Sequence, residues 1–164
     1  MIRLEEHLDG VVTQPGNRVV YDVMRNQAHF GVADVDGQAL VWELGDPGPG
    51  DWLVHCDRVD FPPGGVAYLH THPGPGIRVL LSGRIRIDAA GESHQYGPFE
   101  SWYESGPEPV FAVASETEET SFVRVMLLPA EWAGKRTIRY VNPEDEDKPK
   151  RQQATVFLER PLER

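Results

Sequence analysis

The sequence contains a single cysteine, Cys56, so no disulfide can form within the chain. It also has no apolar run that approaches the roughly 18 residues of a membrane-spanning helix. The first ten residues, MIRLEEHLDG, lack the apolar core of a signal peptide. We therefore expect a cytoplasmic protein without a membrane partner.

Basic residues are also scarce, with 16 Lys and Arg against 26 Asp and Glu, and the formal net charge is −10. An acidic chain repels phosphate backbones, and no basic stripe interrupted by aromatic residues is present, so we expect no nucleic-acid partner. The sequence has no Ser-His-Asp arrangement, no phosphate-binding glycine loop and no dinucleotide fingerprint. These absences argue against the common hydrolase and nucleotide-dependent classes.

Glycine and proline are abundant, with 16 and 14 residues in a chain of 164. They separate short apolar runs instead of interrupting them, as turn residues do in all-β proteins. Many short strands with turn signals every 8–12 residues or so predict a single-domain sandwich or barrel. The expected strands are 18–24, 28–34, 38–44, 52–61, 66–72, 77–81, 84–88, 93–96, 101–104, 110–115, 122–128, 137–141 and 155–158.

Two histidines, His70 and His72, stand one residue apart at the end of an apolar run. On a strand, residues i and i+2 share a face, with Cα atoms roughly 6.6 Å apart. Two imidazoles so placed can bind one divalent ion at the usual Zn–N distance of about 2.0–2.1 Å. The pair predicts a metal site; the alternative is a hydrogen-bonded pair that lines a metal-free pocket.

The segment from Gly64 to Gly83 resembles the first motif of the cupins. Gly64 is followed after five residues by His70-Thr71-His72, then by the turn Pro73-Gly74-Pro75 and a return strand closed by Gly83. The resemblance implies an all-β fold, a single cupin jelly-roll (double-stranded β-helix) barrel with short N-terminal and C-terminal extensions. It also implies dioxygenase, isomerase and decarboxylase activities as candidates.

The chain departs from the cupin pattern at two ligand positions. Gly76 stands where the resemblance places a glutamate ligand, and Pro109 stands where it places a third histidine. Glu104 is the best replacement, because it belongs to the strand expected to face the histidines. A set of His70, His72 and Glu104 suits Fe(II), Mn(II), Ni(II) or Zn(II). The alternative leaves Glu104 in solvent beside the following turn.

Arg78 follows Gly76 by two residues, so it is expected on the histidine face of the return strand. A buried arginine is costly unless it is paired with a carboxylate. Arg78 could pair with Glu104 in a structural ion pair, or hold a substrate carboxylate in a bidentate grip. A register slip of one residue would turn it outward instead.

Two aromatic residues, Tyr68 and Trp102, are expected to bind substrate as walls of the same cavity, with plain core packing as the alternative. Tyr68 precedes His70 by two residues, and Trp102 precedes Glu104 by two. His55 is adjacent to Cys56, so the two face opposite ways on a strand, and His55 is a minor candidate for the pocket.

We expect three segments: an N-terminal extension over 1–15, a cupin barrel over 16–142, and a polar arm with a C-terminal strand over 143–164. The arm contains the apolar-free run PEDEDKPKR. The strand beyond it must pair somewhere to satisfy its backbone, and exchange with a neighbouring subunit would do so. A homodimer is therefore expected.

The sequence thus predicts a metal-binding barrel that acts on or binds a small, acidic organic molecule, as a dioxygenase or an isomerase. A non-catalytic ligand-binding or sensory barrel without a functional metal is the alternative. Whether the protein is an enzyme stays open at this point, and no catalytic residue is assigned.

Overall fold

The computed structural model describes residues 2–3, 17–31, 33 and 35–163. The ordered structure is almost entirely β, and no helix among these residues is long and apolar enough to cross a bilayer. The strands are β1 (Ile2–Arg3), β2 (Arg18–Asp22), β3 (Gln27–Phe30), β4 (Ala39–Glu43), β5 (Trp52–Phe61), β6 (Val66–Thr71), β7 (Gly76–Ser82), β8 (Ile85–Ala89), β9 (Glu92–Tyr96), β10 (Ser101–Glu104), β11 (Val110–Ala114), β12 (Thr120–Pro129), β13 (Arg139–Tyr140) and β14 (Gln153–Pro161). Two short 3-10 helices, η2 (Ala130–Trp132) and η3 (Pro143–Glu146), flank β13.

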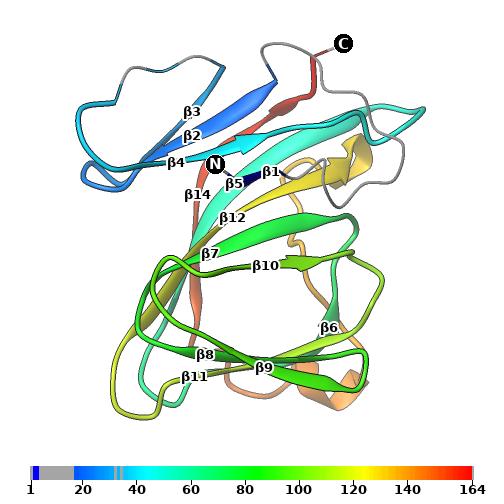
Figure 1. Ribbon diagram of the computed structural model, residues 1–164. Helices are drawn as coiled ribbons and strands as arrows, with labels where there is room; N and C mark the ends of the chain where they lie inside the picture. The colour runs from blue at the N-terminus through cyan, green and yellow to red at the C-terminus, as the bar shows by residue number, and fades with distance from the viewer. Residues whose placement is uncertain (1, 4–16, 32, 34, 164) are drawn as a thin grey trace.

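These strands form three sheets. Two five-stranded sheets, ordered β10-β7-β12-β5-β14 and β13-β6-β11-β8-β9, face each other and enclose the barrel (Figure 1). The remaining sheet, ordered β1-β4-β2-β3, packs on the outer face of the β12 sheet. The expected all-β jelly-roll barrel is confirmed.

The middle sheet is buried on both faces, and this explains the near-continuous apolar run of β12. Val123 and Val125 pack with Tyr21 and Trp42 between the sheets, whereas Phe122 faces the barrel interior. The inward positions of the middle sheet follow the two-residue period of a strand. On its three central strands they are His55, Asp57, Val59 and Phe61 on β5, Arg78 and Leu80 on β7, and Phe122 and Arg124 on β12.

The strands that form the barrel do not cover the expected range 16–142. Strands β2, β3 and β4 form the separate outer sheet, and β14 is an edge strand of the barrel itself. The barrel therefore spans β5 to β14. Alternation of apolar residues predicts that a strand exists, but the sheet it joins is decided by pairing between distant residues. The expected extension over 1–15 lies almost entirely outside the described residues.

The C-terminal strand pairs within its own chain. β14 runs antiparallel to β5, with Gln153 opposite Asp60 and Pro161 opposite Leu53. This pairing satisfies the backbone of β14 along one edge without strand exchange. The homodimer and the cytoplasmic location stay predictions.

Candidate metal centre and binding pocket

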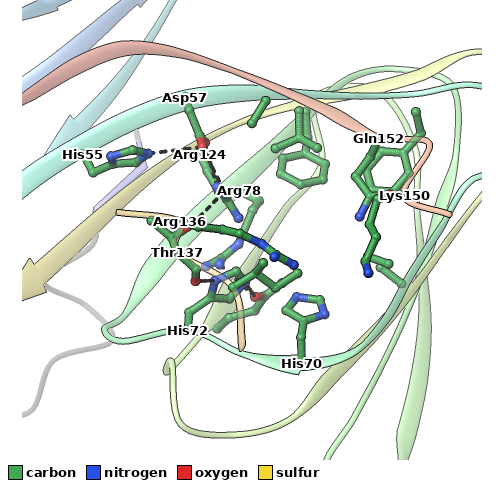
Figure 2. A pocket seen from close by; sticks show the side chains of 18 of the residues that line it. His55, Asp57, His70, His72, Arg78, Arg124, Arg136, Thr137, Lys150 and Gln152 are labelled. Carbon is green, nitrogen blue, oxygen red and sulfur yellow. Dashed lines mark hydrogen bonds and ion pairs between the residues drawn. The ribbon is translucent and has the colours of Figure 1, made fainter. Parts of the chain in front are cut away.

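A cavity of about 500 Å³ lies inside the barrel. This volume lies within the usual range for sites that bind small organic molecules. A cluster of polar side chains occupies one part of it, drawn in Figure 2. The apolar part of its wall includes Val59, Phe61, Ala67, Ile87, Trp102, Ala112 and Phe122.

Three potential metal ligands converge in the polar part of this pocket. His70 and His72 come from the end of β6 and the residue after it, and Glu104 comes from the end of β10. One ligand atom from each residue lies within 4.8 Å of the others, and all three residues are buried. The Nε2 of His72 is 3.4 Å from Oε2 of Glu104.

Both histidines are held so that Nε2 is the free nitrogen. The Nδ1 of His70 donates to the carbonyl of Tyr68, and the Nδ1 of His72 donates to the carbonyl of Thr137, each at 2.6 Å. A carbonyl can only accept, so Nδ1 carries the proton and Nε2 keeps its lone pair. Burial lowers the pKa of both imidazoles, which favours the neutral form that binds metal.

Glu104 also carries an oxygen that is suited to a cation. Its Oε1 accepts a hydrogen bond from Nε1 of Trp102 at 2.9 Å. Its Oε2 is buried and accepts no aligned hydrogen bond within the described part of the chain, although Nη2 of Arg78 lies 2.8 Å away. A buried carboxylate oxygen left without a hydrogen bond is unfavourable, and a metal ion would complete its coordination. The donor set of two neutral imidazoles and one carboxylate fits a divalent ion.

The carboxylate of this set comes from the strand next to the one that the resemblance implied. Glu104 of β10 lies directly opposite Gly76 of β7. A Cβ at Gly76 would lie 2.6 Å from Cγ of Met126 and 2.7 Å from the carbonyl oxygen of Val125. No side chain fits there, and the neighbouring strand supplies the carboxylate at the same register.

Arg78 points into the barrel and is fully buried, so the outward orientation is wrong. Its Nη2 pairs with Glu104, and its Nη1 donates to the carbonyl of Gly76 at 2.8 Å. Burial lowers its pKa to about 10, although Glu104 opposes the shift, so the side chain remains a cation at neutral pH. Of the sequence alternatives, the structure contains the ion pair.

Of the two aromatic residues predicted to line the cavity, Trp102 does so and Tyr68 does not. Trp102 lines the cavity, where it packs against Tyr96 and Phe122. Tyr68 is not among the residues that line this pocket, and its ring lies under Nζ of Lys148 at 4.7 Å. The cause is a register shift between β6 and β11, which places Ala67 and His70 on the same inward face.

Sequence reasoning missed a buried ion pair beside the group of His70, His72 and Glu104. Asp57 accepts two hydrogen bonds from Arg124, at 2.7 Å from Nε and 2.9 Å from Nη2. The same Nη2 donates to Oγ1 of Thr137 at 3.2 Å, and the carbonyl of Thr137 holds His72. The available signal was a charged residue at an inward position of each of two largely apolar strands. Arg124 is thereby connected to His72 through Thr137.

His55 lies in the pocket, and Cys56 faces the opposite way into the core between the sheets. The Nδ1 of His55 is 2.8 Å from Oε2 of Glu159, and its Nε2 is 3.2 Å from Oδ2 of Asp57. Burial alone would lower the pKa of His55, but the two carboxylates outweigh burial and Arg124 and raise it above its ordinary value.

This raised pKa predicts a pH-dependent stability. Protonated His55 contributes its full share to the free energy of unfolding below its unfolded pKa of about 6.5. This contribution is lost as the pH rises through the higher pKa of the folded state. We expect the free energy of unfolding of wild type to fall over that range, and the fall to be smaller in His55→Gln. Urea titrations at several pH values measure both. An identical pH profile in the two proteins would contradict the prediction, and His94→Gln, at an exposed position, is the control.

No protein-family model matches the chain, and no curated protein does. Solved structures match part of it. The polyketide cyclase RemF from Streptomyces resistomycificus is 18% identical in sequence, and the match spans 58% of this chain and 64% of the cyclase, with a TM-score of 0.44. The DMSP lyase DddQ from Ruegeria pomeroyi is 19% identical, and the match spans 61% of this chain and 49% of the lyase, with a TM-score of 0.47.

An RmlC-like cupin from Shewanella frigidimarina is also similar, at 14% identity over 48% of this chain and 68% of its own, with a TM-score of 0.43. Several other solved structures that match part of the chain are also cupins. The likeness is one of fold. The match covers less than two thirds of the cyclase and about half of the lyase.

Proposed function

We propose that this protein binds one divalent metal ion through His70, His72 and Glu104 and accepts a small organic molecule beside it. The observation that carries this proposal is the convergence of two imidazole nitrogens and one carboxylate oxygen within 4.8 Å, in the wall of a cavity. Fe(II), Mn(II), Ni(II) and Zn(II) all suit such a donor set.

The residues around the cluster would prepare it for this role. Arg78 fixes the direction of Glu104, and Thr137 fixes the ring of His72. The apolar wall keeps water from the bound molecule, which strengthens polar interactions within the site. A divalent ion bound there would supply Lewis-acid polarisation of a substrate oxygen. Oxygenation and isomerisation are the proposed reaction classes.

The test is the metal content of the untagged protein by mass spectrometry, before and after reconstitution with each of the four ions. Wild type is expected to hold about one equivalent, because three protein ligands form a site. The His70→Ala/His72→Ala variant is expected to hold none. The control is His29→Ala/His94→Ala, which removes two histidines on other strands that do not line the pocket.

The second candidate function is a metal-free ligand-binding barrel. The ion pair between Arg78 and Glu104 favours it, because a guanidinium already lies 2.8 Å from the oxygen that the metal would use. The same measurement separates the two. Wild type without metal after every reconstitution would contradict the metal site and leave the barrel as a binding protein.

A further inference from the structure

The pocket is positively charged, although the chain is acidic. Five cationic side chains and three carboxylates line it, in a chain whose formal net charge is −10. The cations are Arg78, Arg124, Lys135, Arg136 and Lys150, and the carboxylates are Asp57, Glu104 and Glu146. A local charge opposite to that of the whole molecule attracts an anionic ligand.

The excess positive charge belongs to the segment that follows β12. Arg78 and Arg124 are already paired with Glu104 and Asp57. The segment 135–150 supplies Lys135, Arg136 and Lys150 but only Glu146 as a carboxylate in the pocket. The Nη1 of Arg136 lies 3.3 Å from Oε2 of Glu146, and both side chains are about half exposed, so this contact is a weak surface pair.

Tyr140 brings two of these cations together. The guanidinium of Arg136 lies 5.1 Å from the centre of the Tyr140 ring, and Nζ of Lys150 lies 4.8 Å from it. Figure 2 shows the two side chains reaching into the pocket from opposite sides. A guanidinium and an ammonium near one ring are both suited to bind a carboxylate, since both donate charge-assisted hydrogen bonds.

The rest of the lining indicates the body of the ligand. The side chains of Phe61, Trp102 and Phe122 form an aromatic wall, to which Ile87 and Val59 add aliphatic surface. A purely polar acid would leave this surface in contact with water, whereas an apolar body would cover it.

We propose that the ligand is an aromatic or strongly apolar carboxylic acid, whose carboxylate binds between Arg136 and Lys150 and whose body lies along this wall toward His70 and His72. The proposal deepens the proposed function and rests on it for the place of the metal. It also assigns the carboxylate to residues other than Arg78, because the guanidinium of Arg78 is held by Glu104 and the Gly76 carbonyl.

The test is titration calorimetry on the full chain, both metal-loaded and treated with chelator. Three probes separate the features: 2-naphthoate has the apolar body and the charge, 2-naphthamide has the body alone, and acetate has the charge alone. We expect 2-naphthoate to bind at least about tenfold more tightly than either of the others, because only it makes both sets of contacts.

Two double variants with the same change in net charge locate the contact. Arg136→Gln/Lys150→Gln is expected to weaken 2-naphthoate by about tenfold or more and to leave 2-naphthamide unchanged. The control is Arg139→Gln/Lys148→Gln, whose side chains lie over Trp132 and Tyr68 and do not line the pocket. It is expected to bind all probes as wild type does.

Absence of 2-naphthoate binding, equal binding of acid and amide, or equal weakening by the two double variants would overturn the inference. The outcomes are separable from those of the metal test. Acid-selective binding by a protein that takes up no metal contradicts only the metal function. Metal uptake without acid selectivity contradicts only the ligand class.

Discussion

The Asp57→Asn variant is expected to have a free energy of unfolding about 3–5 kcal/mol below that of wild type. The substitution leaves the guanidinium of Arg124 buried without its carboxylate partner, and it removes an anion from His55. Breaking one side of a buried pair is far more costly than its net contribution, because the remaining charge has lost its water as well. Urea denaturation followed by tryptophan fluorescence measures the change.

The matched control for this variant is Asp60→Asn. Asp60 lies on the same strand and pairs with Arg58 at 2.9 Å, but both side chains are partly exposed to solvent. Its loss is expected to change the free energy of unfolding by no more than about 1 kcal/mol. Similar losses in the two variants would show that burial of the Asp57 pair has no special effect.

The loss of unfolding free energy in Asp57→Asn is also expected to depend on pH. Burial alone would raise the pKa of Asp57, but Arg124 and His55 lower it well below its usual range. The carboxylate therefore contributes stability above its unfolded pKa of about 3.9, and this contribution is lost as the pH falls through the folded value. The difference between variant and wild type is expected to shrink only in strong acid.

Gly74→Ala is expected to destabilise the protein by roughly 3 kcal/mol or more, at the upper end of overpacking substitutions. A Cβ on Gly74 would clash with the carbonyl oxygen of Leu127, which belongs to the buried strand β12. A backbone atom of a central strand cannot move aside as the end of a flexible side chain can. Thermal and urea denaturation measure the loss.

The same substitution is expected to reduce metal binding, because the turn at Gly74 lies against the end of β10. A Cβ at Gly106 would meet the carbonyl of Gly74 at 2.7 Å, and the carbonyl of Gly106 accepts a hydrogen bond from the backbone of His72 at 2.8 Å. This close approach of two turns holds Glu104 beside His72.

Gly97→Ala is the control for the glycine variant. A Cβ there would meet only the carboxylate of Glu100, at 3.5 Å, so stability and metal binding are expected to stay close to wild type. Gly74→Ala with unchanged stability would contradict the close packing of the turn. Lost stability with full metal content at low temperature would separate the packing role from the site.

Much of the barrel follows from local sequence patterns. The predicted strands 52–61 and 101–104 coincide with β5 and β10, and the others overlap the observed strands within a few residues at each end. Turn residues mark where each strand ends, and alternation marks its inward face. That alternation is sufficient to place His70 with His72 on one face of their strand, and Trp102 with Glu104 on one face of theirs.

Only the tertiary structure decided how those surfaces meet. Glu104 lies beside His72 because β10 pairs with β7 at the register of Gly76, and Tyr68 lies outside the pocket because β6 shifts register against β11. Pairing of this kind depends on residues far apart in the chain, and a shift of one residue reverses every face.

The sequence by itself determined an acidic all-β chain with a histidine pair on an inward strand face, because these features depend on composition and on neighbours two residues apart. The fold decided the position of Glu104 beside the two histidines, the buried pair of Asp57 with Arg124, and the cations that Arg136 and Lys150 bring to the pocket. The physical reason is distance along the chain, since Asp57 and Arg124 are 67 residues apart and meet only when β5 pairs with β12.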